Sequence, residues 1–272
     1  MIDIKTKEEI EIMRVGGKIL AEVLGEVLEY VEPGVSELEL DALAEELIRE
    51  KGAEPAFKKV KGYRYSICVS TNDVVVHGIP TNYRFKEGDV VGADCGVYYK
   101  GFNTDMAETL CVSTQNSRLA AKRAKLSPRG EAGKTQNSEK EKFLRTGKRA
   151  LGEAIKVARV GNRIGDISET IQDIVEGSGY CVVRSLVGHG VGRQLHEEPE
   201  VPGFLATKVE NTPRLREGMT IAIEVIYNIG KADVVYANGD GWTIKTKDGS
   251  LSGLFERTIV VTKDGPLVLT QA

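Results

Sequence analysis

Two copies of one nine-residue pattern constrain the fold of this chain more than any other feature. In each copy a cation, Glu and Gly form a turn, and a strand ends six residues later on a carboxylate. The copies are Lys86–Asp94 and Arg216–Glu224, 130 positions apart. The expected helices recur similarly, since Gly34 and Gly161, which follow the first helix of each half, are 127 positions apart. These offsets predict a duplicated α+β unit with a pseudo-two-fold axis.

Helix starts are marked by two capping boxes in the first half, Thr6–Glu9 and Ser36–Glu39. Apolar residues recur after each box at helical spacing, and turn residues follow. We therefore expect a helix from Thr6 that Pro33-Gly34 stops, one from Ser36 to Gly52, one through Phe143–Val157, and one over roughly Ile164–Glu176 that stops at Gly177 or Gly179.

A polar, basic segment separates the two halves. Between Ser117 and Arg149 the chain has 11 Lys and Arg against 3 Glu. We expect an exposed insert over about 115–140, with a short helix at Arg118–Leu126. This basic run is either a solvated loop or a contact for RNA or the ribosome. The expected organisation is one domain over 1–272, with an N-terminal half of about 1–114 and a C-terminal half of about 141–272.

Composition excludes several classes of protein. No run of 18 apolar residues is present, so the sequence predicts no membrane span. The N-terminus is rich in charge and has no apolar core segment, so we expect no signal peptide. The four cysteines form no CxxC pair, which favours reduced thiols in the cytoplasm. They are Cys68, Cys95, Cys111 and Cys181.

The carboxylate that ends the first repeat has an acidic partner. A hairpin turning around Tyr99-Lys100 places Asp94 directly opposite Asp105. Cross-strand partners have Cβ atoms about 4.5–5.5 Å apart. Two acids at that distance repel each other unless a proton or a cation lies between them. The alternative is an exposed acidic hairpin without function.

Further metal-ligand types lie in apolar surroundings. Glu224 lies inside an apolar strand, Glu256 precedes another, and His189 is flanked by glycines. Carboxylates in such strands are costly unless they are paired or metal-bound, although a lone His is more often structural. Together with Asp94 and Asp105 these residues suit two divalent ions, such as Mn²⁺, Fe²⁺ or Co²⁺, with Zn²⁺ also suitable.

The expected chemistry is hydrolysis of an amide or ester. Two ions about 3.5–4 Å apart hold a bridging hydroxide and polarise a carbonyl. The sequence contains no GxSxG motif, no Walker A motif, and no cysteine with an evident His partner. A covalent enzyme intermediate therefore has little support.

These motifs together resemble the type I methionine aminopeptidases, a family with the pita-bread fold. The resemblance covers the chain except about 115–140, in the family's order. The motifs are VHGIP at 76–80, GDVVGAD at 88–94, NTD at 103–105, GHGVG at 188–192, LHEEP at 195–199, GMTIAIE at 218–224, GWT at 241–243 and FERTIVVT at 255–262. It implies two pseudo-symmetric halves, each with antiparallel strands packed by helices, and a metal site at the seam. It also implies a monomer that removes the initiator methionine from nascent proteins.

The resemblance also implies residue roles. Asp94 would chelate one ion, Asp105 and Glu256 would bridge both, and His189 and Glu224 would hold the other. Glu224 would also carry a proton to the leaving amine. His196 would contact the scissile carbonyl or amide, and His77 would stabilise the tetrahedral intermediate or position the amide nitrogen. The methionine pocket would be formed by Phe57, Tyr63, Cys68, Leu195 and Trp242, for which the alternative is plain hydrophobic core.

Four positions depart from the family pattern. Val225 replaces a usual Pro, Arg257 a usual His, Val60 a frequent Tyr, and Gly92 a common Asn. The last puts an auxiliary monovalent-cation site in doubt, but none of the four removes a metal ligand. Two other functions stay open. A peptidase of the aminopeptidase P or prolidase kind usually has an additional N-terminal domain, and a non-catalytic pita-bread binding protein typically loses metal ligands.

Overall fold

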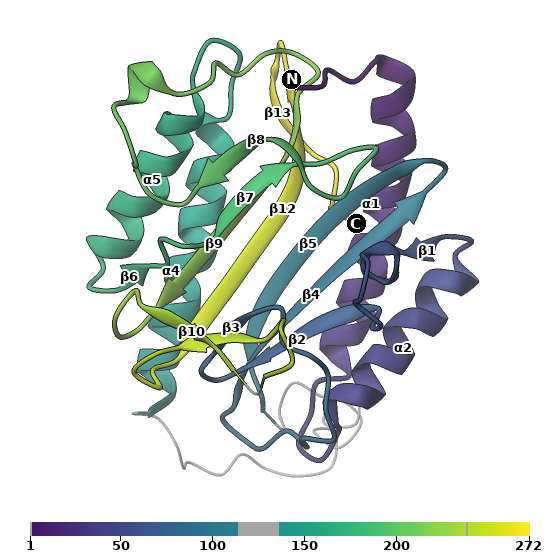
Figure 1. The fold of residues 1–272 in the computed structure, drawn as a ribbon, viewed down its shortest axis with the longest axis vertical. Coiled ribbons are helices and arrows are strands. Elements are labelled where there is room, and N and C mark those ends of the chain that lie inside the picture. Colours follow the sequence, from purple (N-terminus) through teal and green to yellow (C-terminus); the bar gives the residue numbers. More distant parts are fainter. Residues whose placement is uncertain (1, 114–135, 238) are drawn as a thin grey trace, which may run out of the picture.

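Two helices from each half of the chain pack against a central sheet (Figure 1). The computed structural model describes residues 2–113, 136–237 and 239–272. In this part of the chain the α-helices are α1 (Lys7–Glu29), α2 (Glu37–Glu50), α4 (Gln136–Val157) and α5 (Ile164–Glu176). The predicted α+β fold is confirmed.

The two predicted capping boxes are present and begin α1 and α2. The Thr6 hydroxyl accepts from the Glu9 amide at 3.3 Å, and the Glu9 carboxylate accepts from the Thr6 amide at 2.8 Å. Ser36 and Glu39 form the same pair of hydrogen bonds at 3.3 and 2.7 Å. Each box satisfies amide groups that a helix N-terminus would otherwise leave without partners.

Helix α4 is longer than predicted. It begins at Gln136 and not near Phe143, so its first residues lie within the segment expected as an insert over about 115–140. Apolar periodicity in α4 begins only at Phe143, because the preceding turns carry polar side chains, and this hid the helix start from the sequence pattern. The predicted helix at Arg118–Leu126 lies outside the described residues.

The main sheet crosses both halves, with strand order β1-β4-β5-β12-β9-β7-β8 and antiparallel pairing throughout. β2 and β6 add to β4 and β9, β13 adds to β12, and β10, β11 and β3 form a second sheet. The first-half strands are β1 (Glu54–Pro55), β2 (Ile67–Thr71), β3 (Val74–Val76), β4 (Val90–Tyr99) and β5 (Phe102–Cys111). The others are β6 (Cys181–Val182), β7 (Val187–Gly190), β8 (Glu197–Pro202), β9 (Thr220–Asn228), β10 (Val234–Tyr236), β11 (Ile244–Thr246), β12 (Ser252–Thr262) and β13 (Gly265–Val268).

The predicted pseudo-two-fold runs between β5 and β12, which lie side by side at the centre of Figure 1. β4 and β9 begin 130 positions apart, at Val90 and Thr220, and flank this pair symmetrically. The helices repeat the relation. Gly17 in α1 and Gly147 in α4 are also 130 positions apart. A Cβ atom on Gly17 would lie 2.4 Å from Leu269 O, and one on Gly147 would lie 2.4 Å from Phe255 Cδ2. Each half therefore brings its long helix close to neighbouring structure through an equivalent glycine.

Each half has its own hydrophobic core between helices and sheet. One contains Leu20, Leu24 and Val91, and the other Phe143, Ile167 and Ile223, all almost fully buried. Burying a side chain of this size contributes about 1.5–3 kcal/mol. Among the described residues, no helix combines the length and apolar composition needed to cross a membrane.

Candidate metal centre

Strand register gathers carboxylates from both halves in one row. Asp94 on β4 pairs with Ala107 on β5, Ala107 pairs with Glu256 on β12, and Glu256 pairs with Glu224 on β9. Directly opposed residues share a face of a sheet, so three carboxylates project to the same side. Asp105 lies two residues from Ala107 along β5, and His189 on β7 pairs with Ala222, two residues from Glu224. Period-two alternation puts both on that face.

The predicted hairpin register was wrong by two residues. The turn consists of Lys100 and Gly101, at φ 45° and 94°, between the paired Tyr99 and Phe102. Two positive φ values are the signature of the type I′ hairpin turn, for which a Gly is preferred. Asp105 therefore pairs with Gly96, and the two acids are diagonal neighbours.

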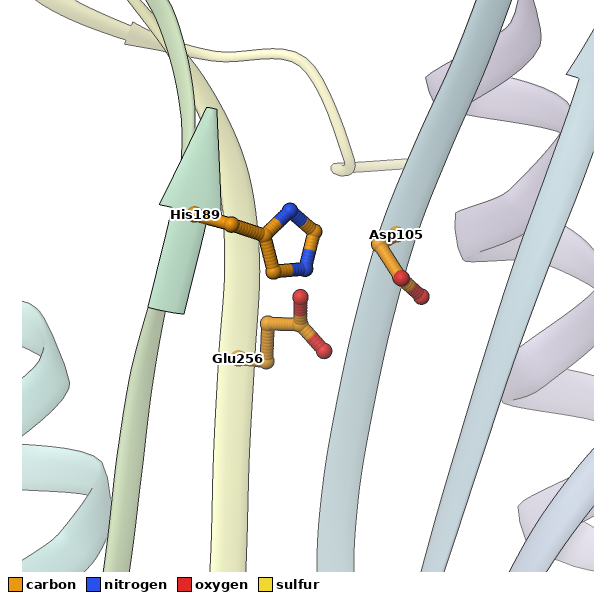
Figure 2. A group of neighbouring side chains, drawn as sticks. All are labelled: Asp105, His189 and Glu256. Atoms are coloured by element: carbon orange, nitrogen blue, oxygen red, sulfur yellow. The ribbon is translucent and has the colours of Figure 1, made fainter. Parts of the chain in front are cut away.

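Asp105, His189 and Glu256 point toward one another from β5, β7 and β12 (Figure 2). One ligand atom from each lies within 4.8 Å of those of the other two, and all three residues are buried. Glu224 completes the other side, with its Oε1 atom 3.5 Å from His189 Nε2. Asp94 lies on the remaining side, beside Asp105. The structure thus brings together all five residues predicted as metal ligands.

Burial gives these carboxyl groups a high affinity for protons. Loss of hydration raises the pKa of Asp94 to about 7. The pKa of Asp105 is raised by burial and then by the charges of Asp94 and Glu224. Burial followed by neighbouring carboxylates also raises the pKa of Glu224 and of Glu256. Their ionised forms therefore need compensating positive charge at neutral pH.

The His189 ring is held in its neutral form. Its Nδ1 atom lies 2.9 Å from the Gly190 carbonyl oxygen, which assigns the ring proton to Nδ1 as a hydrogen-bond donor. Burial, followed by the neighbouring His196, lowers the pKa of His189 to about 4. At neutral pH the contact between His189 Nε2 and Glu224 is therefore no salt bridge, and when Glu224 is ionised two lone pairs face each other. A cation between them would relieve this repulsion.

Two buried carboxylate oxygens without hydrogen-bond partners in the described part of the chain indicate that the site is suited to a metal ion. Asp94 Oδ1 and Glu256 Oε1 are buried and have no hydrogen-bond partner among the described residues. Buried acceptors without partners are rare because each costs about 1–3 kcal/mol. Four carboxylates and one imidazole are suitable donors for divalent first-row ions. The residues therefore fit such ions.

The other two histidines lie beside this centre. The His196 ring packs edge-on against His189 at a centroid distance of 4.4 Å. His77 follows β3 with φ 54°, a strained conformation for a residue other than Gly. Burial and then His196 lower the pKa of His77, and burial lowers that of His196. Both histidines, with Glu224, line a cavity of about 440 Å³.

The residues predicted for a methionine pocket pack in one apolar cluster. Its members include Phe57, Tyr63, Cys68, Leu195 and Trp242. Cys68 pairs with Asp94 across β2 and β4, so the cluster adjoins the acidic row. The Tyr63 hydroxyl donates to Ile67 O at 2.8 Å, and its ring meets Trp242 edge-on at 5.1 Å.

Sequence reasoning missed Tyr65 and Ile79, which pack in the same cluster. Ile79 belongs to the VHGIP motif and could have been found by its place beside His77. Tyr65 follows Tyr63 by two positions, and nothing in the pattern singled it out.

The departures from the family pattern lie at the edge of the site or away from it. Arg257 projects to the opposite face of β12, donates to Ala107 O at 3.0 Å, and pairs with Glu108 at 2.7 Å. Val225 is fully buried in the second-half core, and Val60 packs beside the apolar cluster. At Gly92 a Cβ atom would lie 3.3 Å from Thr109 Oγ1, within the sheet.

Comparison with known proteins agrees with this geometry. The model of metallopeptidase family M24 matches residues 11–263. A methionine aminopeptidase of Clostridium perfringens is 41% identical over 270 residues, which cover 99% of each chain. The solved structure of a methionine aminopeptidase from Thermotoga maritima is 39% identical, with a TM-score of 0.87 over the whole of both chains. A prolidase from Pyrococcus horikoshii, at 24% identity and a TM-score of 0.71, shares the fold, and the match covers 63% of its length.

Proposed function

The chain belongs to metallopeptidase family M24 and, within it, to the methionine aminopeptidases, and we propose that its five clustered ligand residues form the centre that removes the initiator methionine. Its substrates are the N-termini of nascent proteins. The observation that carries the site assignment is the row of buried carboxylates beside a neutral His189, whose free ring nitrogen faces them. The centre uses residues of both halves, so 1–272 acts as one catalytic domain.

Membership of a metallopeptidase family implies divalent metal ions. Two ions would be held, one by Asp94 and one by His189 and Glu224, with Asp105 and Glu256 shared between them. Support comes from the charge of four neighbouring carboxylates, which a single divalent ion would only half neutralise. Fe²⁺, Mn²⁺, Co²⁺ and Zn²⁺ all suit this donor set. When bound, such ions polarise the scissile carbonyl and lower the pKa of a water molecule.

Glu224 is the proton carrier of the reaction. It borders both the acidic row and the cavity, where a carboxylate can take up a proton and then release it. The proton goes from the attacking water to the amine of the leaving peptide.

His77 and His196 stabilise the substrate on the cavity side. Because burial lowers the pKa of both, each ring is neutral at pH 7 and carries one N–H donor. His196 donates toward the scissile carbonyl or amide, and His77 toward the tetrahedral intermediate or the amide nitrogen. Donors fixed before the reaction stabilise a developing oxyanion without reorganisation.

The apolar cluster of Phe57, Tyr63 and Cys68 receives the methionine side chain, with the partly buried Leu195 and Trp242 packed against it. A thioether gains favourable contacts from aromatic edges and sulfur. Burial raises the pKa of the Cys68 thiol, which keeps this wall uncharged.

The cellular setting follows from the substrate. Nascent chains emerge at cytoplasmic ribosomes, so the enzyme works there as a monomer. The basic insert over about 115–140 forms its contact with the ribosome. Deleting 114–135 tests this, because the cut spares α4. Unchanged salt-sensitive co-sedimentation with ribosomes would exclude the contact, and size-exclusion chromatography with light scattering tests the monomer.

A peptide assay tests the catalytic proposal. We expect Met-Ala-Ser to be cleaved when Mn²⁺, Fe²⁺ or Co²⁺ is supplied, and Glu224→Ala to abolish cleavage. Glu217→Ala is a matched control, since Glu217 lies in the turn before β9 and is exposed. Robust turnover after complete chelation would overturn the metal assignment. Preference for Xaa-Pro peptides would indicate a prolidase-like activity.

A further inference from the structure

Lys5 is a buried lysine whose ammonium group contacts Glu197, the residue that follows His196. Its side chain is 1% exposed, and its Nζ atom pairs with the carboxylate of Glu197 and, at 3.1 Å, with that of Asp3. Glu197 is itself only 13% exposed and follows His196 directly. A buried charge of this kind is costly unless its partner is held in place. The pair therefore specifies where Glu197 lies.

Glu197 in turn fixes the backbone that carries His196. Its Oε1 atom accepts from the amide of Gln194 at 2.9 Å, while its Oε2 atom meets Lys5. The carboxylate thus closes residues 194–197 into a small loop, and Leu195 and His196 are the two residues inside it. These are a pocket residue and the proposed carbonyl contact.

The opposite end of the loop has separate anchors. The Asn103 side chain donates to the carbonyls of Gly192 and Arg193 at 3.0 and 3.1 Å, and Arg193 pairs with Glu9. None of these contacts reaches residues 195 and 196. The His196 end is held by the pairing of Glu197 with Gly190, by the Gly192 amide, which donates to Gln194 O at 3.0 Å, and by the Glu197 side chain with Lys5 against it.

Because Gly192 has no side chain, the Lys5 side chain has room to reach Glu197. A Cβ atom at residue 192 would lie 2.3 Å from Lys5 Cε, 2.6 Å from its Nζ and 3.0 Å from Glu197 Oε1, so it would crowd both members of the ion pair. The Lys5 backbone is held independently, since its amide donates to Gly218 O at 2.9 Å. A methyl group at 192 would thus displace the ammonium group while leaving its charge and the N-terminal segment in the protein.

We propose that Lys5 is a positioning residue for His196, acting through Glu197 to hold the imidazole over the cavity. The proposal rests on the proposed function, in which His196 contacts the scissile carbonyl or amide. Lys5 touches neither substrate nor metal ligands. Its loss would leave the acidic row intact and misplace one donor, and misplacement by about 1 Å costs roughly 100-fold in rate.

The first experiment compares Lys5→Met with Lys51→Met on the metal-loaded enzyme. Lys51 pairs with Glu22, outside the catalytic site, and serves as the matched control. We expect Lys5→Met to lower kcat for Met-Ala-Ser by about 10- to 100-fold with a smaller change in KM, because His196 acts mainly on the reacting group. Gly192→Ala is expected to shift kcat in the same direction, and Lys51→Met to leave it unchanged. Equal kcat values for Lys5→Met and wild type would overturn the proposal.

A double-mutant cycle separates positioning from general stability. If Lys5 acts through Glu197, Lys5→Met has little further effect on kcat in a Glu197→Gln background. The same loss in both backgrounds would mean that Lys5 acts only through the fold, and the proposal would be wrong.

Amide hydrogen exchange of residues 194–197 gives a readout independent of activity. We expect faster exchange there in Lys5→Met, with residues 188–190 of β7 unchanged. Unchanged exchange at 194–197 would refute the positioning role even if wild type failed to cleave methionine peptides. That failure alone would count against the proposed function.

Discussion

Replacing Asp94 with Asn is expected to stabilise the metal-free protein at alkaline pH. The folded-state pKa of Asp94 is raised from 3.8 to about 7 because the carboxyl group is buried. A raised pKa means that the folded state binds the proton more tightly than the unfolded chain. Stability from this group is therefore fully present below pH 3.8 and is lost as the pH rises through 7. Asn keeps the shape of the side chain and removes the charge.

The magnitude follows from the shift in pKa. At about 1.4 kcal/mol per pKa unit, ionised Asp94 costs the metal-free fold about 4 kcal/mol at pH 8. At pH 5 the folded group is mostly protonated, and the difference falls to about 2 kcal/mol. Asp94→Asn should recover these amounts in chelator and should weaken metal binding, because it removes one of the five proposed ligands.

Urea unfolding of wild type and Asp94→Asn in EDTA, at pH 5 and pH 8, measures both free energies. Asp248→Asn is a control for which we expect the opposite effect, a lower free energy of unfolding. Backbone hydrogen bonds from Lys231, then contacts with Ser250, lower the pKa of Asp248 to about 2, so its contribution is present above pH 3.8 and lost as pH falls through 2. The reasoning is refuted if Asp94→Asn destabilises metal-free protein at pH 8, or if its effect is equal at both pH values.

Three further predictions concern the metal, the seam and the pocket. Mn²⁺ should raise the Tm more at pH 8 than at pH 5, because metal binding must displace protons from the carboxyl groups whose pKa is raised. A smaller rise in Tm at pH 8 would contradict this. Arg257→Ala should lower the free energy of unfolding by about 1–3 kcal/mol, since it removes the charged donor of the Ala107 carbonyl and leaves Glu108 with Lys148 as its cation. Retention of the Mn²⁺-induced Tm shift in that variant would agree with its place on the opposite face. Trp242→Ala should raise KM for Met-Ala-Ser several-fold without changing that Tm shift, and an unchanged KM would place methionine elsewhere.

Local features were predicted correctly where the interactions that produce them join residues only a few positions apart. The capping boxes at Thr6 and Ser36 depend on hydrogen bonds that span three positions, so the sequence displays both partners together. α5 matches its predicted range because a continuous apolar stripe runs between clear end signals. α4 was predicted too short because its first turns are polar and have no such stripe.

The hairpin shows that an error of two residues in strand register does not change the face of the sheet on which a side chain lies. The error moved the pairing partner of Asp94 from Ala107 to Asp105, a shift of two residues. Side chains alternate with a period of two, so a shift of two changes partners and keeps faces. The two aspartates were therefore expected on one side of the sheet, where they do lie.

The sequence by itself determined the duplicated α+β unit, the helix starts and the types of ligand that the chain offers. These follow from periodicity and from short-range hydrogen bonding, which neighbouring residues specify. Only the tertiary structure decided that Glu256 stands beside Ala107 at the seam, that Arg257 turns away from the metal face, and that Lys5 reaches Glu197 past Gly192. Each of these contacts joins residues about 150 or more positions apart, where strand register and close packing, and no local pattern, select the partner.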